Sequence, residues 1–263
     1  MRDVLQKAEQ MSEMTLPNGM RVWQLEQGAT AYLYRDVFTD AGWIKHGIDL
    51  RAGEAVIDIG AHIGLASLYF STIQPACRVI ACEPADAPFE ALERNLRRHL
   101  PEACALHVAI GSAKGRSALT YYPQNTIMSS LYADPAADRA ITMQYLANIG
   151  LPAAAAEGLV GSRFQSRQIE CDVQTLSDII ERCGAEDVGL VKVDAERAEL
   201  DVLLGLQERH WSCIRQFAIE AHDLPDGRLS RLVRGLVSHG FRTYAEQDSD
   251  LQGTELVKVF ARR

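Results

Sequence analysis

The sequence predicts an α/β fold built on a doubly wound, seven-stranded, mostly parallel sheet of the Rossmann-like kind. Short apolar strands alternate with helical segments from residue 53 onward. A glycine-rich turn follows the first of these strands and leads directly into a helix. The last two strands, expected at residues 241–246 and 256–261, follow one another without a helix between them, which indicates an antiparallel pair at the sheet edge.

The amino-acid composition and charge of the chain exclude several classes of partner and binding site. The chain has 263 residues, 47% of them hydrophobic and 24% charged, which allows one large globular domain. Its formal net charge of −8 is offset by no basic cluster, so nucleic acid is not expected as a partner. There is no apolar leader and no apolar run of membrane-spanning length, so we expect no membrane partner and a cytoplasmic location. The six cysteines lack C-x-x-C spacing, which argues against a zinc site or a disulfide framework.

Residues 1–52 precede the first parallel strand and are expected to form an N-terminal arm or cap. Alternation over residues 20–25, after a Pro-Asn-Gly turn, predicts a β-hairpin. Residues 32–48 carry apolar side chains at roughly helical spacing and are expected to pack beside a ligand cleft. The remainder, residues 53–263, is predicted to be the ligand-binding domain.

The first strand and turn indicate the ligand. Residues 54–59 read as a buried strand, and the turn from Gly60 to Gly64 then opens a helix whose first N–H groups can face an anion. A second strand at residues 78–82 ends on Glu83, which can accept both hydroxyls of a ribose. An adenosine-bearing ligand is therefore expected across the ends of these strands.

The spacing of the glycines distinguishes between adenosine ligands. A dinucleotide-binding turn has the pattern G-x-G-x-x-G, but here His62 stands at the middle glycine position. Asp58 would repel a pyrophosphate, whereas it could accept a hydrogen bond from an ammonium group. S-adenosylmethionine carries an amino acid at one end and adenosine at the other, so it fits this pattern better than a dinucleotide.

The middle of the chain continues the alternation and then interrupts it. A helix is expected over residues 84–100 and a third strand over residues 105–110, with Ala109 at its end facing the adenine. Residues 117–168 break the pattern, and long insertions in compact domains are usually lids or binding loops. Residues 151–161 within it are low in complexity and expected to be mobile. The alternative for this insertion is a disordered surface excursion.

The pattern resumes after residue 168, and the acids of the later strands are expected to meet at one edge. The fourth strand, residues 189–194, brings Asp194 and then Glu196, and the fifth, residues 216–222, ends on Glu220 and His222. Ligands of open α/β sheets bind beyond these carboxyl ends. Lys192 precedes Asp194 on the same strand face; either it is a salt-bridged structural lysine or it takes part in the reaction.

The chain also resembles a known family, the FkbM-type S-adenosylmethionine-dependent methyltransferases, over roughly residues 50–261. The resemblance rests on five motifs and on the chain end Phe260-Ala261-Arg262; the motifs are Val56-Ile57-Asp58-Ile59-Gly60-Ala61, Cys82-Glu83-Pro84, Asn95-Leu96, Ser129-Ser130-Leu131 and Leu190-Val191-Lys192-Val193-Asp194-Ala195-Glu196-Arg197-Ala198-Glu199. His62 stands where many members have asparagine, and Arg197 where many have glycine. The resemblance implies a class I methyltransferase fold.

The Glu-Arg-Ala-Glu form of the last motif is similar to members associated with polyketide and nonribosomal-peptide assembly, where O-methylation is usual. The resemblance therefore implies methylation of a hydroxyl on a small or carrier-bound secondary metabolite, and a homodimer is compatible with it. Methylation of a nitrogen or of a sugar hydroxyl remains an alternative. So do a nicotinamide-dependent oxidoreductase and a non-catalytic partner protein of this fold.

Two mechanisms remain open at this point. Methyl transfer to a hydroxyl needs a base, and His222, oriented by Glu220 or Asp194, has a suitable ordinary pKa. Alternatively Asp194, Glu220 and His222 hold a divalent metal such as Mg²⁺ that acidifies the hydroxyl. Lys192 and Glu196 complete the predicted catalytic group. The residues predicted to bind the cofactor are Asp58, Gly60, His62, Gly64, Glu83, Ala109 and Asp194.

Overall fold

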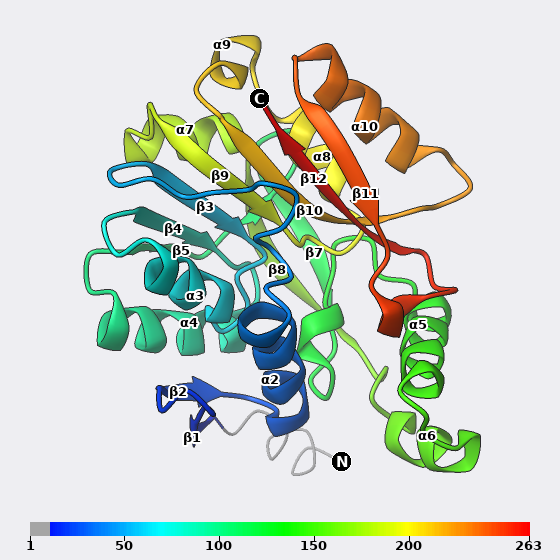
Figure 1. The fold of residues 1–263 in the computed structure, drawn as a ribbon. Coiled ribbons are helices and arrows are strands. Elements are labelled where there is room, and N and C mark those ends of the chain that lie inside the picture. The colour runs from blue at the N-terminus through cyan, green and yellow to red at the C-terminus, as the bar shows by residue number, and fades with distance from the viewer. Residues whose placement is uncertain (1–10) are drawn as a thin grey trace.

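A computed structural model describes residues 11–263, so the first ten residues of the predicted arm lie outside the described part. The main element is a seven-stranded sheet with the order β11-β12-β10-β9-β3-β4-β5 (Figure 1). Only β12 runs against its neighbours, pairing antiparallel with both β10 and β11, which confirms the predicted doubly wound sheet and its antiparallel edge. Its strands are β3 (Ala55–Ile59), β4 (Arg78–Cys82), β5 (Cys104–Leu106), β9 (Val188–Val193), β10 (Gln216–His222), β11 (Arg242–Glu246) and β12 (Leu256–Arg262).

The strand order reverses between β3 and β9, which are parallel neighbours. Gly60 follows β3 and Asp194 follows β9, so these two residues lie at the switch point where ligands of such sheets bind. Their backbones approach so closely that a Cβ on Gly60 would lie 1.8 Å from the carbonyl oxygen of Asp194. Gly60 also has a φ of +70°, so glycine is required here on both counts.

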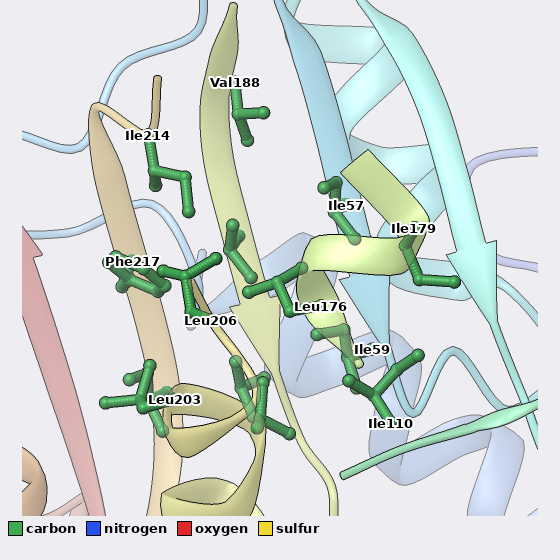
Figure 2. Packing of buried hydrophobic residues seen from close by; sticks show 14 of the residues in the cluster. Ile57, Ile59, Ile110, Leu176, Ile179, Val188, Leu203, Leu206, Ile214 and Phe217 are labelled. Atoms are coloured by element: carbon green, nitrogen blue, oxygen red, sulfur yellow. The ribbon is translucent and has the colours of Figure 1, made fainter. Parts of the chain in front are cut away.

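One face of the sheet carries the largest hydrophobic cluster. Ile57 and Ile59 of β3 and Val191 and Val193 of β9 point to this face, and all four are almost completely buried. Figure 2 shows Leu176, Ile179 and Leu203 packing onto them. The helices on this side are α7 (Leu176–Cys183), α8 (Glu199–Leu204), α9 (Glu208–Trp211) and α10 (Arg228–Ser238).

The other face is covered by α3 (Leu65–Ile73) and α4 (Asp86–His99), together with a segment of the N-terminal arm. Apolar residues of this layer include Val56, Phe70 and Trp43, each at most 2% exposed. Asp58 and Lys192 point to the same side, because they alternate with the residues of the first cluster. A buried acid and a buried lysine therefore share an otherwise apolar layer.

The third predicted strand is not continuous, which corrects the expectation for residues 105–110. β5 ends at Leu106, the chain turns with a hydrogen bond from Val108 N–H to Leu106 O (3.0 Å), and β6 (Ala109–Ile110) joins a different sheet. That three-stranded sheet has the order β6-β8-β7 and also contains β7 (Gly115–Tyr121) and β8 (Arg167–Gln174). The turn moves Ala109 away from the main sheet but leaves it beside the switch point.

The insertion is ordered as helices between β7 and β8. A short 3₁₀ turn, η2 (Thr126–Met128), is followed by α5 (Pro135–Asn148) and α6 (Ala153–Val160), which lie together at one corner of the molecule (Figure 1). Most of residues 151–161, the stretch expected to be mobile, forms α6, because this alanine-rich sequence has high helix propensity and packs Ala156 and Val160 inward; its mobility stays a prediction.

The arm contains the predicted hairpin, formed by β1 (Ser12–Thr15) and β2 (Arg21–Gln24). It continues into α2 (Gln27–Tyr34), one π-helical turn (Arg35–Thr39) and irregular turns up to residue 50. A last 3₁₀ turn, η3 (Ser249–Leu251), lies against α5 before β12. Within residues 11–263, no helix is both long and apolar enough to cross a bilayer.

Candidate active site

Two adjoining pockets open at the carboxyl ends of β3, β4 and β9. The first is lined on one side by Gly60, His62 and Glu83 and on the other by Val108, Ala109 and Ile110. It therefore brings together the turn after β3, the acid after β4 and the residues around β6. Predicted site residues Gly60, His62, Glu83, Ala109 and Asp194 all line this pocket, whereas Gly64 lies behind it, packed against Leu92.

The second pocket has a volume of about 370 Å³ and a mostly apolar wall. Its apolar residues come from α2, η2, α5 and α6, and include Leu33, Met128, Ile141 and Leu159. The predicted lid insertion thus forms much of this wall. Three carboxylates also reach the pocket: Asp194, Glu196 and Glu220.

Asp194 and Glu196 line both pockets, so the two cavities meet at these carboxylates. The loop that carries them is held from behind: Ser130 Oγ donates to the carbonyl oxygen of Glu196. Arg197 adopts a φ of +69°, unusual for a residue with a Cβ, and pairs with Asp138 Oδ1 and Glu255 Oε1 at 2.5 and 2.8 Å. These ion pairs explain how an arginine can be accommodated at a position where many members of the family have glycine.

Glu83 is placed to receive a polar ligand. It is 6% exposed, and its two carboxylate oxygens accept the backbone N–H groups of His62 and Ala85, each at 2.9 Å. Each oxygen keeps a further lone pair for a ligand hydroxyl. Burial raises the pKa of Glu83 to about 7, although these N–H groups favour its charged form.

His62 lines the same pocket and faces the insertion. Its Nε2 lies 2.8 Å from Thr126 Oγ1, and Nδ1 is buried without a hydrogen-bond partner among residues 11–263. Burial, helped by the positive charge of Lys192, lowers the pKa of His62 to about 3. The imidazole is therefore neutral at physiological pH.

Asp58 is positioned differently from the prediction. It is completely buried, Lys192 Nζ lies 3.0 Å from its Oδ1, and Ser67 Oγ donates to its Oδ2 at 2.7 Å. It lines neither pocket, so in this structure it has no access to a ligand ammonium. The expected contact therefore stays a prediction that this geometry does not favour, because the sheet's own lysine already faces the carboxylate.

Lys192 is the buried centre of this arrangement rather than a pocket residue. Its Nζ contacts Asp58, Asp194 Oδ2 (3.3 Å) and Gly60 O (2.8 Å), and it lies 5.0 Å from the centre of the Trp43 ring. Burial opposes its charge, but the two carboxylates outweigh burial and raise the pKa of Lys192. Of the two alternatives for Lys192, the structure favours the salt-bridged lysine, which links β3 to Asp194.

His222 is also held by carboxylates and lines neither pocket. Its Nδ1 lies 2.8 Å from Glu199 Oε1 and its Nε2 lies 3.4 Å from Glu196 Oε2. Burial opposes protonation, yet the two glutamates outweigh it and raise the pKa of His222 to about 10. A cationic imidazole with both nitrogens facing acids has no lone pair for a substrate proton, so this geometry does not suit the predicted base.

The proposed metal ligands are likewise regrouped. Asp194, Glu196 and Glu220 each place one carboxylate oxygen within 4.8 Å of the others, whereas His222 stands behind Glu196. The histidine of the predicted ligand set is therefore replaced by a glutamate. Burial raises the pKa of all three acids, most strongly that of Glu220, where nearby Asp194 adds to the effect.

Sequence reasoning missed Tyr32, Thr126 and Glu199. Tyr32 lines the second pocket, and burial next to Glu220, Asp36 and Asp194 raises the pKa of its phenol. Tyr32 comes from the arm and Thr126 from the insertion, and neither residue belongs to a motif quoted above. Glu199 was quoted within the longest motif but given no role; its spacing from Glu196 was the only available signal.

The chain is similar in sequence to known methyltransferases. A family model described as "Methyltransferase FkbM domain" matches residues 58–243. The chain is 38% identical over 251 residues to a 31-O-demethyl-FK506 methyltransferase, FkbM, of Streptomyces tacrolimicus, covering 95% of this chain and 96% of that protein.

Two further relatives differ in size. The chain is 30% identical to the methyltransferase sdnD of Sordaria araneosa, over 80% of this chain and 81% of that one. It is 34% identical to the AMB antimetabolite synthetase AmbE of Pseudomonas aeruginosa, where the match covers 97% of this chain but 13% of the synthetase. A methyltransferase family thus replaces the oxidoreductase alternative. The chain belongs to the FkbM methyltransferase family, which confirms the resemblance of its motifs.

Proposed function

We propose that this chain is an S-adenosylmethionine-dependent O-methyltransferase that modifies a hydroxyl of a secondary metabolite. One observation carries the proposal: the pocket at the switch point, which contains Glu83 and His62, and a larger, mostly apolar pocket meet at Asp194 and Glu196. The first pocket suits the cofactor, with Glu83 facing the ribose and Ala109 the adenine. The second suits a largely apolar acceptor whose hydroxyl enters at the carboxylates.

The chemistry required of the chain is mainly orientation. The acceptor oxygen forms a bond to the methyl carbon while the bond from that carbon to the sulfonium sulfur breaks, leaving S-adenosylhomocysteine. Holding these atoms in line supplies most of the rate. The apolar wall from α5 and α6 would exclude water, which also prevents loss of the methyl group to solvent.

Glu196 is our candidate for the base that takes the hydroxyl proton. It lines both pockets, and His222 faces its Oε2 from behind. Burial raises the pKa of Glu196, which makes its carboxylate a better proton acceptor. Asp194 is the alternative candidate, because it lines both pockets as well and likewise has a cation beside it, with Lys192 3.3 Å from its Oδ2. His222 then acts as a positioning residue.

A divalent cation is compatible with the same carboxylates. Asp194, Glu196 and Glu220 offer hard oxygen donors close enough to share one ion, which suits Mg²⁺. Such an ion, when bound, would lower the pKa of a coordinated hydroxyl. Dialysis against a chelator tests this alternative: activity that is lost and then restored by Mg²⁺ would assign proton removal to the ion instead of Glu196.

The acceptor class rests on the relatives. One of them is named as a 31-O-demethyl-FK506 methyltransferase and another as an antimetabolite synthetase, and both names point to secondary metabolites. The apolar lining of the second pocket fits a bulky acceptor with few charges. We therefore propose a polyketide or peptide product, or its carrier-bound intermediate.

A transfer assay tests the proposal. The chain is incubated with methyl-labelled S-adenosylmethionine and 31-O-demethyl-FK506 as a first acceptor, and products are analysed by mass spectrometry. We expect one added methyl group on oxygen. Glu196→Gln should lower turnover by about 10²–10⁴-fold with unchanged cofactor affinity. Glu93→Gln, on the exposed side of α4, is the matched control and should have no effect. Failure of the wild type to bind S-adenosylhomocysteine contradicts the proposal.

A further inference from the structure

His62 has an unusual combination of features for a residue in a glycine-rich turn. Its φ is +50°, so its backbone takes up a conformation that residues with a Cβ rarely adopt. Its backbone N–H is committed to Glu83, and its ring reaches Thr126 of the insertion. Nδ1, the other ring nitrogen, is buried with no hydrogen-bond partner among residues 11–263. A buried polar atom without a partner is costly unless a ligand supplies one.

The neighbouring hydrogen bonds assign the proton on this ring. Glu26 Oε1 accepts from both the backbone N–H and the Oγ1 hydroxyl of Thr126, at 2.8 and 3.0 Å. A hydroxyl has one proton, and here a carboxylate takes it, so Thr126 Oγ1 can only accept from His62. Nε2 of His62 therefore carries the hydrogen and donates to Thr126 over 2.8 Å. Nδ1 is left with a free lone pair.

The ring stays neutral, which keeps that lone pair available. Burial and the charge of Lys192 lower the pKa of His62 to about 3. The acidic neighbours that could favour a charged ring are already occupied: Glu26 by Thr126, and Glu83 by two backbone N–H groups. Nδ1 is thus a hydrogen-bond acceptor that needs a donor from the pocket.

We propose that Nδ1 of His62 accepts a hydrogen bond from the α-ammonium group of S-adenosylmethionine, and that Glu26 and Thr126 are positioning residues that fix the required tautomer. This inference rests on the proposed cofactor. The cofactor has three kinds of donor: the ribose hydroxyls face Glu83, and the adenine amine belongs to the wall at Ala109. The ammonium is the donor that remains for the wall formed by His62 and Thr126.

The arrangement also joins three parts of the chain. Glu26 precedes α2 in the arm, Thr126 begins η2 in the insertion, and His62 belongs to the turn after β3. All three must be in place for Nδ1 to present its lone pair. Two of these segments, α2 and η2, also supply residues to the second pocket, so the positioning of His62 depends on elements that line the acceptor side.

Binding of two ligands to three variants tests the inference by calorimetry. S-adenosylhomocysteine carries the ammonium group, and 5′-methylthioadenosine lacks the whole amino-acid end. His62→Asn keeps an oxygen acceptor near the position of Nδ1, whereas His62→Gln moves its amide toward the position of Nε2. We expect His62→Ala and His62→Gln to bind S-adenosylhomocysteine about 10- to 100-fold more weakly, and His62→Asn to bind it within about threefold of the wild type.

The second ligand separates the amino-acid end from the ribose. Binding of 5′-methylthioadenosine should be the same in the wild type and all three variants. If the variants lose the same affinity for both ligands, the contact is to the nucleoside. If His62→Ala binds S-adenosylhomocysteine as tightly as the wild type, His62 makes no contact with the ligand. Either result overturns the inference. Absence of S-adenosylhomocysteine binding to the wild type would instead overturn the proposed cofactor. If His62→Ala fails to fold, the Asn and Gln pair still decides.

The tautomer is measured separately by ¹⁵N NMR of the imidazole in the wild-type protein. We expect the hydrogen on Nε2 across pH 5 to 9, and a mixture of tautomers in Thr126→Val. A wild-type ring protonated on Nδ1, or charged within this range, contradicts the assignment regardless of the binding data.

Discussion

Lys192 Nζ lies 3.0 Å from Asp58 Oδ1 between the two central strands, and both side chains are at most 3% exposed. The lysine also reaches Asp194 and the carbonyl oxygen of Gly60, so one buried cation connects the turn after β3 with the acid after β9. Removing one member leaves the other charge without its principal partner. Buried ion pairs are costly to break in this way.

Asp58→Ala should therefore lower the free energy of unfolding by about 3–5 kcal/mol. Its effect on cofactor affinity should be small, because Asp58 lines neither pocket. Denaturant unfolding and calorimetry measure the two quantities. Glu90→Ala, which breaks an exposed pair with Arg94 on α4, is the control and should change stability by at most about 0.5 kcal/mol. A large loss of affinity in a stable Asp58→Ala protein would return this residue to the binding site.

Glu83 should make cofactor binding depend on pH. Its pKa is raised to about 7 by burial, and ribose hydroxyls bind best to its charged form. Affinity for S-adenosylhomocysteine should therefore rise as pH increases through about 7, with uptake of the ligand releasing a proton below that pH. Calorimetry in buffers of different ionisation enthalpy detects the released proton.

Glu83→Gln is the matched variant for that measurement. It keeps a similar shape but cannot titrate, so its affinity should not change between about pH 6 and pH 8. Glu83→Ala should weaken binding by about 1.5–3 kcal/mol, the range of a hydrogen bond to a charged group. Identical pH profiles for the wild type and Glu83→Gln would show that another group titrates.

His222 should contribute stability that depends on pH. Its pKa is about 10 in the folded chain and near 6.5 in an unfolded one, because Glu196 and Glu199 hold its charged form despite burial. A histidine with a raised pKa stabilises the fold fully below its unfolded pKa, and this contribution is lost as pH rises through the folded value. The stability difference between the wild type and His222→Gln should therefore shrink between pH 6.5 and pH 10. A constant difference over that interval would mean that His222 is neutral.

Residues 133–165 should become more protected when both ligands are bound. This span contains α5 and α6, which supply the apolar wall of the second pocket. Closure of this wall on an acceptor reduces local opening, so amide hydrogen exchange should slow with S-adenosylhomocysteine and acceptor together. Exchange in α7, which lines neither pocket, serves as the internal reference. If amide exchange in residues 133–165 is the same with and without ligands, the insertion is a fixed wall of the pocket and not a lid.

Local pattern was enough to predict the succession of strands and helices along the chain and the polar residues that follow the first two strands and β9. The turn from Gly60 to Gly64, Glu83 after β4 and Asp194 after β9 follow from apolar runs, glycines and acids that are adjacent in sequence. Parallel strands bring their carboxyl ends to one edge, so the first pocket could be placed without coordinates. The split of the third strand could not, because the turn at Leu106 competes with continuing the strand and β8 supplies the new partner.

The sequence by itself determined the fold, the family resemblance and the location of the acids; the tertiary structure decided which partner each acid has. Asp58 and Lys192 are 134 positions apart, and only the adjacency of β3 and β9 makes them an ion pair. Glu196 and Glu199 both face His222, and this arrangement does not suit the predicted base. The free lone pair of His62 depends on Thr126 and Glu26, from two distant segments. Protonation states follow from burial and neighbouring charges, and these exist only after the chain has folded.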